Sequence, residues 1–182
     1  LDPGSKDNSR DIIREESKYY NAHFIFQDDD GQVNSLNNGF LRSNGDILTW
    51  LNSDDYYIDN NVIELVMKTF SENPDIDFVY GKGLFVDEND ITKVDPSQWT
   101  EGLNKEPSTF KQFFIDHVGI LQPAVFFRRN VLDKIGLLDD HDQYAFDYDY
   151  WIRSIKKNLK WKYIDNYLAK AVLQEDAKTV NF

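Results

Sequence analysis

The spacing of apolar residues divides the chain into alternating strand-like and helix-like segments. Helical spacing predicts helices over residues 12–20, 32–43, about 60–72, 110–114, 131–135 and 148–157. Short apolar runs predict strands over residues 24–26, 47–51, 78–80, 84–86, 124–127 and 161–164. Strands that alternate with helices are typical of a sheet that has helices on both faces. We therefore expect an α/β fold with a mostly parallel sheet.

An acidic turn, Asn52-Ser53-Asp54-Asp55, directly follows the predicted strand 47–51. In open α/β sheets, ligands bind outside the carboxyl ends of the strands, so this turn lies where a ligand is expected. The stretch 95–108, which contains Trp99, has no clear periodicity. It predicts an irregular insert.

Composition and charge narrow the class of protein. The 182 residues are enough for one sizeable core, and 15% aromatic residues is a globular composition. No apolar run approaches the ~20 residues that span a bilayer. Because the chain has no cysteine, disulfides and thiolate metal sites are excluded. The net charge of −12 argues against non-specific nucleic-acid binding, since phosphate contacts need a basic face.

The neighbouring carboxylates of Asp54 and Asp55 repel each other and are costly to desolvate. A hard cation such as Mg²⁺ or Mn²⁺ would relieve both costs, because it prefers carboxylate, water and phosphate oxygens. It would also neutralise a departing diphosphate as a Lewis acid. The alternative is an acidic turn that only caps the following helix.

Asp147 lies in the aromatic stretch Phe146-Asp147-Tyr148-Asp149-Tyr150-Trp151. Desolvation among aromatic rings raises the pKa of a carboxyl group, which suits a general base. The alternative is ordinary capping of the helix that follows. The histidines His23, His117 and His141 have no metal-ligand spacing and are expected to be structural or exposed.

In combination, these features resemble the family 2 glycosyltransferases. The motifs that carry the resemblance occur in the family's order: DxGQ, NxGF, GDI, WLNSDD, VYG, QPAVFFRR and FDYDYW. The resemblance extends from about residue 1 to residue 179. It implies one GT-A domain over 1–182 whose first strand lies outside this chain. Residues 1–90 would form the nucleotide-sugar-binding half and residues 91–182 the acceptor-binding half.

The resemblance also implies a role for each candidate residue. Asp147 would be the base that deprotonates the acceptor hydroxyl, Asp55 would bind the metal ion, and Asp54 would be a second ligand that contacts the sugar or ribose. The other donor-binding residues would be Asp2, Gln32, Asn37 and Arg153. The acceptor side would hold Gln122 and Asp149. Asp149 and Arg153 would also support the loop that carries the base.

The chain departs from the family pattern at three positions. Pro3 follows Asp2 where the family often has an acidic residue or a glycine. Phe146 replaces a frequent glutamate, which removes one charge but leaves the base. Gln174 stands where many relatives have a histidine that can reach the metal, with Glu175 beside it. These departures concern the nucleobase contact and the third metal ligand.

The implied reaction is transfer of a sugar, with inversion, from a nucleotide-diphosphate donor to a saccharide or lipid-linked hydroxyl. A UDP-sugar is the expected donor, and surface polysaccharide or glycolipid synthesis in a bacterium is the expected process. The expected location is the cytoplasm, with peripheral contact to the inner face of the membrane as an option. The alternative is a non-catalytic nucleotide-sugar-binding or partner-positioning domain. A nucleotidyltransferase would need a basic glycine-rich loop, which these residues do not supply.

Overall fold

The computed structural model describes residues 2, 4–20, 23–26, 30–95, 120–141 and 145–173. The chain forms two compact units. The first unit comprises Leu1–Asn44 and Leu137–Phe146, and the second comprises Gly45–Gly136 and Asp147–Phe182. Within the described ranges, no helix combines the length and apolarity needed to cross a membrane.

Several sequence predictions are not tested by the structure. The division into units does not fall at residue 90, and the functional halves 1–90 and 91–182 stay a prediction. The insert with Trp99 and the predicted helix 110–114 lie outside the described residues.

The first unit contains the helices α1 (Ser9–Glu16) and α2 (Gln32–Arg42). α2 begins at the predicted residue and buries Val33 and Phe40, which lie two turns apart on one face. It ends where Ser43 becomes extended and donates a hydrogen bond from its hydroxyl to the carbonyl of Phe40 at 2.9 Å. Of the predicted strand 24–26, Phe26 forms a single parallel bridge with Asp2.

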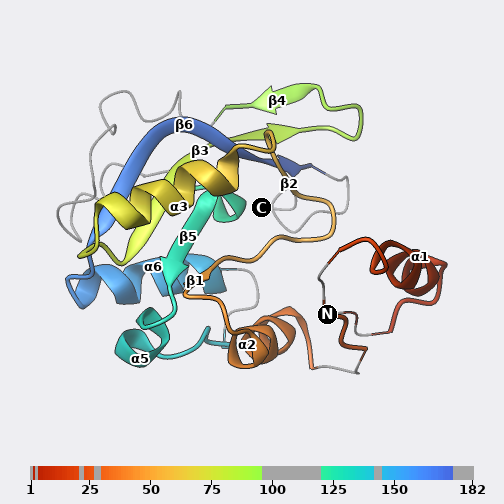
Figure 1. Ribbon diagram of the computed structural model, residues 1–182, viewed down its shortest axis with the longest axis horizontal. Coiled ribbons are helices and arrows are strands. Elements are labelled where there is room, and N and C mark those ends of the chain that lie inside the picture. Colours follow the sequence, from red (N-terminus) through yellow and green to blue (C-terminus); the bar gives the residue numbers. More distant parts are fainter. Residues whose placement is uncertain are drawn as a thin grey trace. The chain divides into compact units, whose positions relative to one another are not determined.

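A six-stranded sheet forms the centre of the second unit (Figure 1). Its strands are β1 (Ile47–Leu48), β2 (Tyr56–Tyr57), β3 (Phe78–Val86), β4 (Thr92–Val94), β5 (Val125–Arg128) and β6 (Trp161–Val172). The strand order is β1-β5-β3-β6-β2, and β4 pairs with β3. β6 is much longer than the predicted strand 161–164, because it pairs with β3 over the whole length of β3.

The sheet is mixed, so the prediction of a mostly parallel sheet is wrong for the described strands. Among them, β3 and β6 form the one parallel pair. The pairs β1·β5, β3·β5, β3·β4 and β2·β6 are antiparallel. β1 and β3 do run in the same direction, as a strand–helix–strand unit requires, but β5 lies between them. Alternation along the sequence cannot reveal a later strand that inserts in this way. The α/β class itself is confirmed.

Helices cover both faces of this sheet. α3 (Val62–Glu72) buries Val62, Val66 and Phe70, which recur every four residues. These side chains form a core with residues of three strands, namely Val79, Phe126, Ile164 and Leu168. The opposite face packs against α6 (Phe146–Lys156), where the rings of Tyr150 and Trp151 contact the ring of Phe78. Successive strand residues point to opposite faces of the sheet, so Phe78 packs against α6 and Val79 packs against α3.

β3 is one continuous strand where the sequence predicted two. Its register with β6 shifts on either side of Lys82, between the glycines Gly81 and Gly83. A Cβ atom on Gly81 would lie 2.6 Å from the side chain of Leu168, and one on Gly83 would lie 2.2 Å from that of Leu121. The two glycines therefore permit close packing within a strand and do not end it.

Replacing Gly83 with alanine is expected to destabilise the protein by about 1–3 kcal/mol, because the buried side chain of Leu121 would have to shift. Urea denaturation measures this free energy of unfolding. The matched control is Lys82→Ala in the same irregularity. It should cost no more than about 1 kcal/mol, since it removes a partly exposed ion pair with Asp165. Equal losses in both variants would contradict the close approach at Gly83.

Candidate active site

Side-chain hydrogen bonds hold the segment that leads from β1 into the acidic turn. Thr49 Oγ1 donates to the carbonyl of Val125 at 2.9 Å. Gln122, in the 3₁₀ helix η2 (Gln122–Ala124), donates from Nε2 to the carbonyl of Trp50 at 2.7 Å. Because β1 is only two residues long, its backbone hydrogen bonds alone hold this segment weakly, and the two side-chain hydrogen bonds hold it further. Gln122, which was predicted on the acceptor side, thus has an observed contact that fixes the approach to the turn.

Asp55 is the buried member of the acid pair, with 9% of its surface exposed. Asn52 Nδ2 donates a hydrogen bond to Asp55 Oδ2 at 2.8 Å, which closes the turn. Burial raises the pKa of Asp55, and the charge of Asp54 raises it further. Hydrogen bonds from the Asn52 side chain and from the backbone of Val172 oppose this rise but do not cancel it. A carboxylate in this state is stabilised by a nearby cation.

Asp147 is the second residue of α6 and is half-buried. Its Oδ1 accepts a hydrogen bond from the backbone N–H of Tyr148 at 2.7 Å. Burial is the largest influence on this carboxyl group and raises its pKa, whereas the backbone hydrogen bond lowers it. The raised pKa that the aromatic surroundings predicted is therefore present. Its role as a base stays a prediction.

A stacked pair of tryptophans joins the two segments that carry these carboxyl groups. The rings of Trp50 and Trp151 lie 5.6 Å apart between centroids, at an interplanar angle of 21°. Trp50 precedes Asp54 by four residues, and Trp151 follows Asp147 by four residues, about one helical turn. Sequence motifs alone did not single out this contact. A conspicuous signal was available, because both tryptophans lie inside the motifs WLNSDD and FDYDYW.

Asp149 and Arg153 form an ion pair one turn apart on α6, with Arg153 Nε 2.7 Å from Asp149 Oδ2. Arg153 Nη1 also donates to the carbonyl of Ile135 at 2.6 Å, at the end of α5 (Val131–Ile135). These contacts agree with the predicted support of the segment that carries Asp147. It stays a prediction that Arg153 contacts the donor and that Asp149 contacts the acceptor.

Asp2 is buried in the first unit and closes a turn. Its Oδ1 accepts hydrogen bonds from the backbone N–H groups of Gly4 and Ser5, at 2.7 and 2.8 Å, and from Arg10 Nε at 3.2 Å. These bonds, those from the backbone above all, hold the pKa of Asp2 far below its ordinary value. Asp2 is thus an ionised carboxylate whose observed partners lie within the chain.

Asn37 and Gln32 belong to α2 of the first unit. The side-chain amide of Asn37 donates to the carbonyl of Leu138 and accepts from its N–H, each at 3.0 Å. This reciprocal pair ties the segment Leu137–Phe146 to α2 across 101 residues of sequence. Gln32 is the first residue of α2, at the end where backbone N–H groups favour an anion. Nucleotide contacts by both residues stay predictions.

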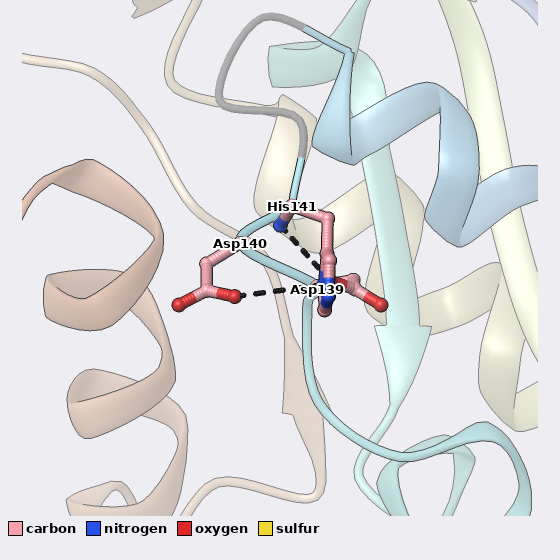
Figure 2. Close-up of side chains that lie close together, drawn as sticks. All are labelled: Asp139, Asp140 and His141. Atoms are coloured by element: carbon pink, nitrogen blue, oxygen red, sulfur yellow. Dashed lines mark hydrogen bonds and ion pairs between the residues drawn. The ribbon is translucent and has the colours of Figure 1, made fainter.

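Asp139, Asp140 and His141 form an additional cluster of potential metal ligands (Figure 2). The His141 ring contacts Asp139, which raises the pKa of the histidine. All three residues are exposed, and solvent can satisfy such a cluster without an ion. His23 and His141 are exposed as predicted, whereas His117, Gln174 and Glu175 lie outside the described residues.

The fold and the site together define a class of protein. A helix-flanked sheet presents an acidic turn after a strand, and a desolvated carboxyl group lies at the start of the helix on one face of the sheet. This is the arrangement expected of nucleotide-diphospho-sugar transferases, the class to which the sequence motifs pointed.

The chain belongs to glycosyl transferase family 2, whose model matches residues 1–136. It is 26% identical to an uncharacterized glycosyltransferase of Rickettsia typhi, with 100% of this chain and 55% of the relative covered. It is also 26% identical to an uncharacterized glycosyltransferase of Methanocaldococcus jannaschii, with 93% of this chain and 57% of the relative covered. The chain thus spans little more than half the length of these relatives.

Solved structures share the fold at low sequence identity. TarS 1–349 of S. aureus in complex with UDP-GlcNAc matches with a TM-score of 0.69 and 15% identity, covering 100% of this chain and 50% of TarS 1–349. The mannosyltransferase PcManGT from Pyrobaculum calidifontis, in complex with GDP-Man and Mn²⁺, matches with a TM-score of 0.62 and 12% identity. That match covers 97% of this chain and 48% of PcManGT. The predicted GT-A fold is confirmed.

The raised pKa of Asp147 predicts how its replacement changes stability with pH. A carboxyl group whose folded pKa exceeds its unfolded pKa stabilises the fold below the unfolded pKa, and this contribution is lost as the pH rises through the folded pKa. The melting temperature of Asp147→Asn, relative to that of the parent, should therefore increase between about pH 4 and about pH 7. Asp133→Asn on exposed α5 is the control. A flat or falling difference for Asp147→Asn would mean that its carboxyl group is not desolvated.

Proposed function

We propose that the protein transfers a sugar from a nucleotide-diphosphate donor to a hydroxyl acceptor with inversion at the anomeric carbon. The observation that carries this proposal is that Asp55 and Asp147, two carboxyl groups with pKa values raised by burial, lie on segments joined by the Trp50–Trp151 stack. Family membership supports a nucleotide-sugar as the donor. The proposal requires Asp55 to lie near the diphosphate of the bound donor and Asp147 to lie near the acceptor hydroxyl that attacks it.

Asp147 is the general base of the proposed reaction. The acceptor oxygen attacks the anomeric carbon from the face opposite the diphosphate, and Asp147 accepts the hydroxyl proton as the new bond forms. This single displacement inverts the anomeric configuration. Its raised pKa makes Asp147 a stronger base than a solvent-exposed aspartate. Its position at the start of α6, fixed by the buried ring of Trp151 one turn later, limits the movement of the carboxyl group.

Asp54 and Asp55 would hold the divalent cation, Mg²⁺ or Mn²⁺. They fit such an ion because both offer hard oxygen ligands, and because the pKa of Asp55 stays raised despite the hydrogen bond from Asn52. When bound, the ion supplies charge neutralisation at the departing nucleotide diphosphate. The Mn²⁺ and GDP-Man in the PcManGT complex support this choice of ion and donor class.

The remaining predicted residues complete the proposed substrate sites. Asp54 and Gln32 serve the donor, whereas Gln122 and Asp149 serve the acceptor side. Asp2 and Asn37 act on the nucleotide through the turn and the segment that their hydrogen bonds hold. The UDP-GlcNAc bound by TarS supports a UDP-sugar donor. A saccharide or lipid-linked acceptor, in cytoplasmic synthesis of surface polysaccharide or glycolipid, completes the proposal.

Asp147→Asn should lower the turnover number of sugar transfer by about 10²–10⁴-fold, because it removes the base but keeps the shape of the side chain. Release of nucleoside diphosphate from a panel of nucleotide sugars measures turnover, and calorimetry with UDP and Mn²⁺ measures donor-site affinity. The affinity should be unchanged, since the variant leaves Asp54 and Asp55 in place. Turnover at the parent rate in Asp147→Asn would remove Asp147 from its role. UDP binding by a parent protein without turnover would favour the non-catalytic alternative.

Mn²⁺ should raise the melting temperature of the parent protein, and Asp55→Asn should abolish this increase, because an ion that binds the folded state stabilises it by mass action. Differential scanning fluorimetry with and without Mn²⁺ measures both effects. Asp140→Asn, in the exposed acidic cluster of Figure 2, is the matched control and should retain the full increase. If Mn²⁺ raised the melting temperature of Asp55→Asn but not that of Asp140→Asn, the ion would bind at the exposed cluster, which contradicts the proposed mechanism.

A further inference from the structure

Arg153 links two helices of the second unit. From α6, its guanidinium group binds Asp149 Oδ2 through Nε at 2.7 Å and the carbonyl of Ile135 through Nη1 at 2.6 Å. The guanidinium carbon also lies 5.0 Å from the ring centroid of Tyr150. The side chain is 26% exposed, so most of it is enclosed by these contacts.

A second side chain of α6 binds the same end of α5. The hydroxyl of Tyr150 donates to the carbonyl of Gly136 at 3.2 Å, directly after the carbonyl that Arg153 uses. Gly136 has a φ of 80°, which a residue with a side chain rarely adopts. Carbonyl groups at a helix C-terminus lack partners within the helix and carry partial negative charge, so a guanidinium group is a favourable partner there.

Asp147 leaves α6 on a different side from this clamp. At 3.6 residues per turn, Asp147 and Asp149 point roughly 160° apart around the helix axis, and Asp147 and Arg153 roughly 120° apart. Trp151 is separated from Asp147 by only about 40° and stacks on Trp50. The helix that carries Asp147 is therefore held by an aromatic contact on one side and by Arg153 on the other.

We propose that Arg153, oriented by Asp149, is a positioning residue for the base Asp147 and does not bind the donor phosphates. This inference rests on the proposed function. A phosphate that drew the guanidinium group out of this position would break its bonds to both Asp149 and the carbonyl of Ile135. In place, it fixes the axial position and rotation of α6. The position of Asp147 relative to the acceptor hydroxyl follows from both.

The two roles predict opposite kinetic effects for Arg153→Met. Misplacement of a reacting group by about 1 Å can cost on the order of 10²-fold in rate, so the positioning role predicts a fall in turnover number of about 10–100-fold. The dissociation constant of UDP in the presence of Mn²⁺, measured by calorimetry, should change by less than about 3-fold. A phosphate-binding role predicts the reverse, with weakened UDP binding as the main effect. That result would overturn the proposal.

Arg153→Lys sharpens the comparison, because lysine keeps the charge but loses the planar fork. A phosphate contact should be largely restored by lysine, whereas positioning should not. Asp149→Asn should reproduce the fall in turnover in milder form, since it weakens the orientation of Arg153 without removing it. If Arg153→Met does not fold, Arg153→Lys and Asp149→Asn decide between the roles by the same two measurements.

Arg128→Met is the matched control for general destabilisation. Arg128 caps the end of α3 in a similar way, donating to the carbonyls of Ile76, Phe70 and Asn73 at 2.7–3.2 Å. Its loss should lower the melting temperature and leave the turnover number of the folded protein unchanged. An equal fall in turnover for Arg128→Met would reduce the effect of Arg153 to stability alone and overturn the proposal.

Asp147→Asn, assayed in parallel, separates this inference from the proposed function. If Asp147→Asn retains turnover, Asp147 is not the base and the positioning role fails with it, whereas a parent protein without turnover would contradict the proposed function itself. If Asp147→Asn loses turnover while Arg153→Met keeps it, the base is confirmed and only the positioning role is wrong.

Discussion

The packing of Trp151 determines where α6 can lie, and the candidate base moves with this helix. Its ring contacts Trp50, Phe78 and Trp161, with centroid distances of 5.6, 5.9 and 5.5 Å. Aromatic pairs of this kind contribute about 0.5–1.5 kcal/mol each beyond the burial of their surface. The cluster therefore connects the sheet, the segment that leads into the acidic turn, and α6. Hydrogen bonds from Gln122 and Arg153 add further constraints on the same segments.

The carboxyl groups of Asp55 and Asp147 are unfavourable for folding when they are ionised. Burial raises the pKa of both Asp55 and Asp147, and no described ion pair compensates either of them. Asp2 shows the contrast, because backbone hydrogen bonds and Arg10 stabilise its charge. Structural carboxylates in this protein are satisfied by the chain itself. Under the proposed function, Asp55 would gain from a cation and Asp147 from a proton, which is the division of roles that sugar transfer requires.

Membership of glycosyl transferase family 2 and the local chemistry agree. The family model matches residues 1–136, whereas Asp147 lies beyond that range and has a pKa that burial raises. The two solved structures that share the fold are complexes with a nucleotide sugar, and one also contains Mn²⁺. The candidate residues of the first unit act differently, because Asp2 and Asn37 form hydrogen bonds that shape the backbone around them.

The sequence by itself determined the positions of four described helices and the chemical character of the site, whereas α1 begins and ends earlier than the predicted helix 12–20. The periodicity of α2, α3, α5 and α6 predicted their positions, since each helix buries one stripe of side chains, and the aromatic neighbours of Asp147 predicted its raised pKa. Only the tertiary structure decided that β5 enters between β1 and β3, that Gly81 and Gly83 lie within one strand, and that Asn37 pairs with Leu138. Helical periodicity is a local property of the chain. Strand order and paired side chains depend on contacts between distant residues, and no local pattern encodes which of these contacts form.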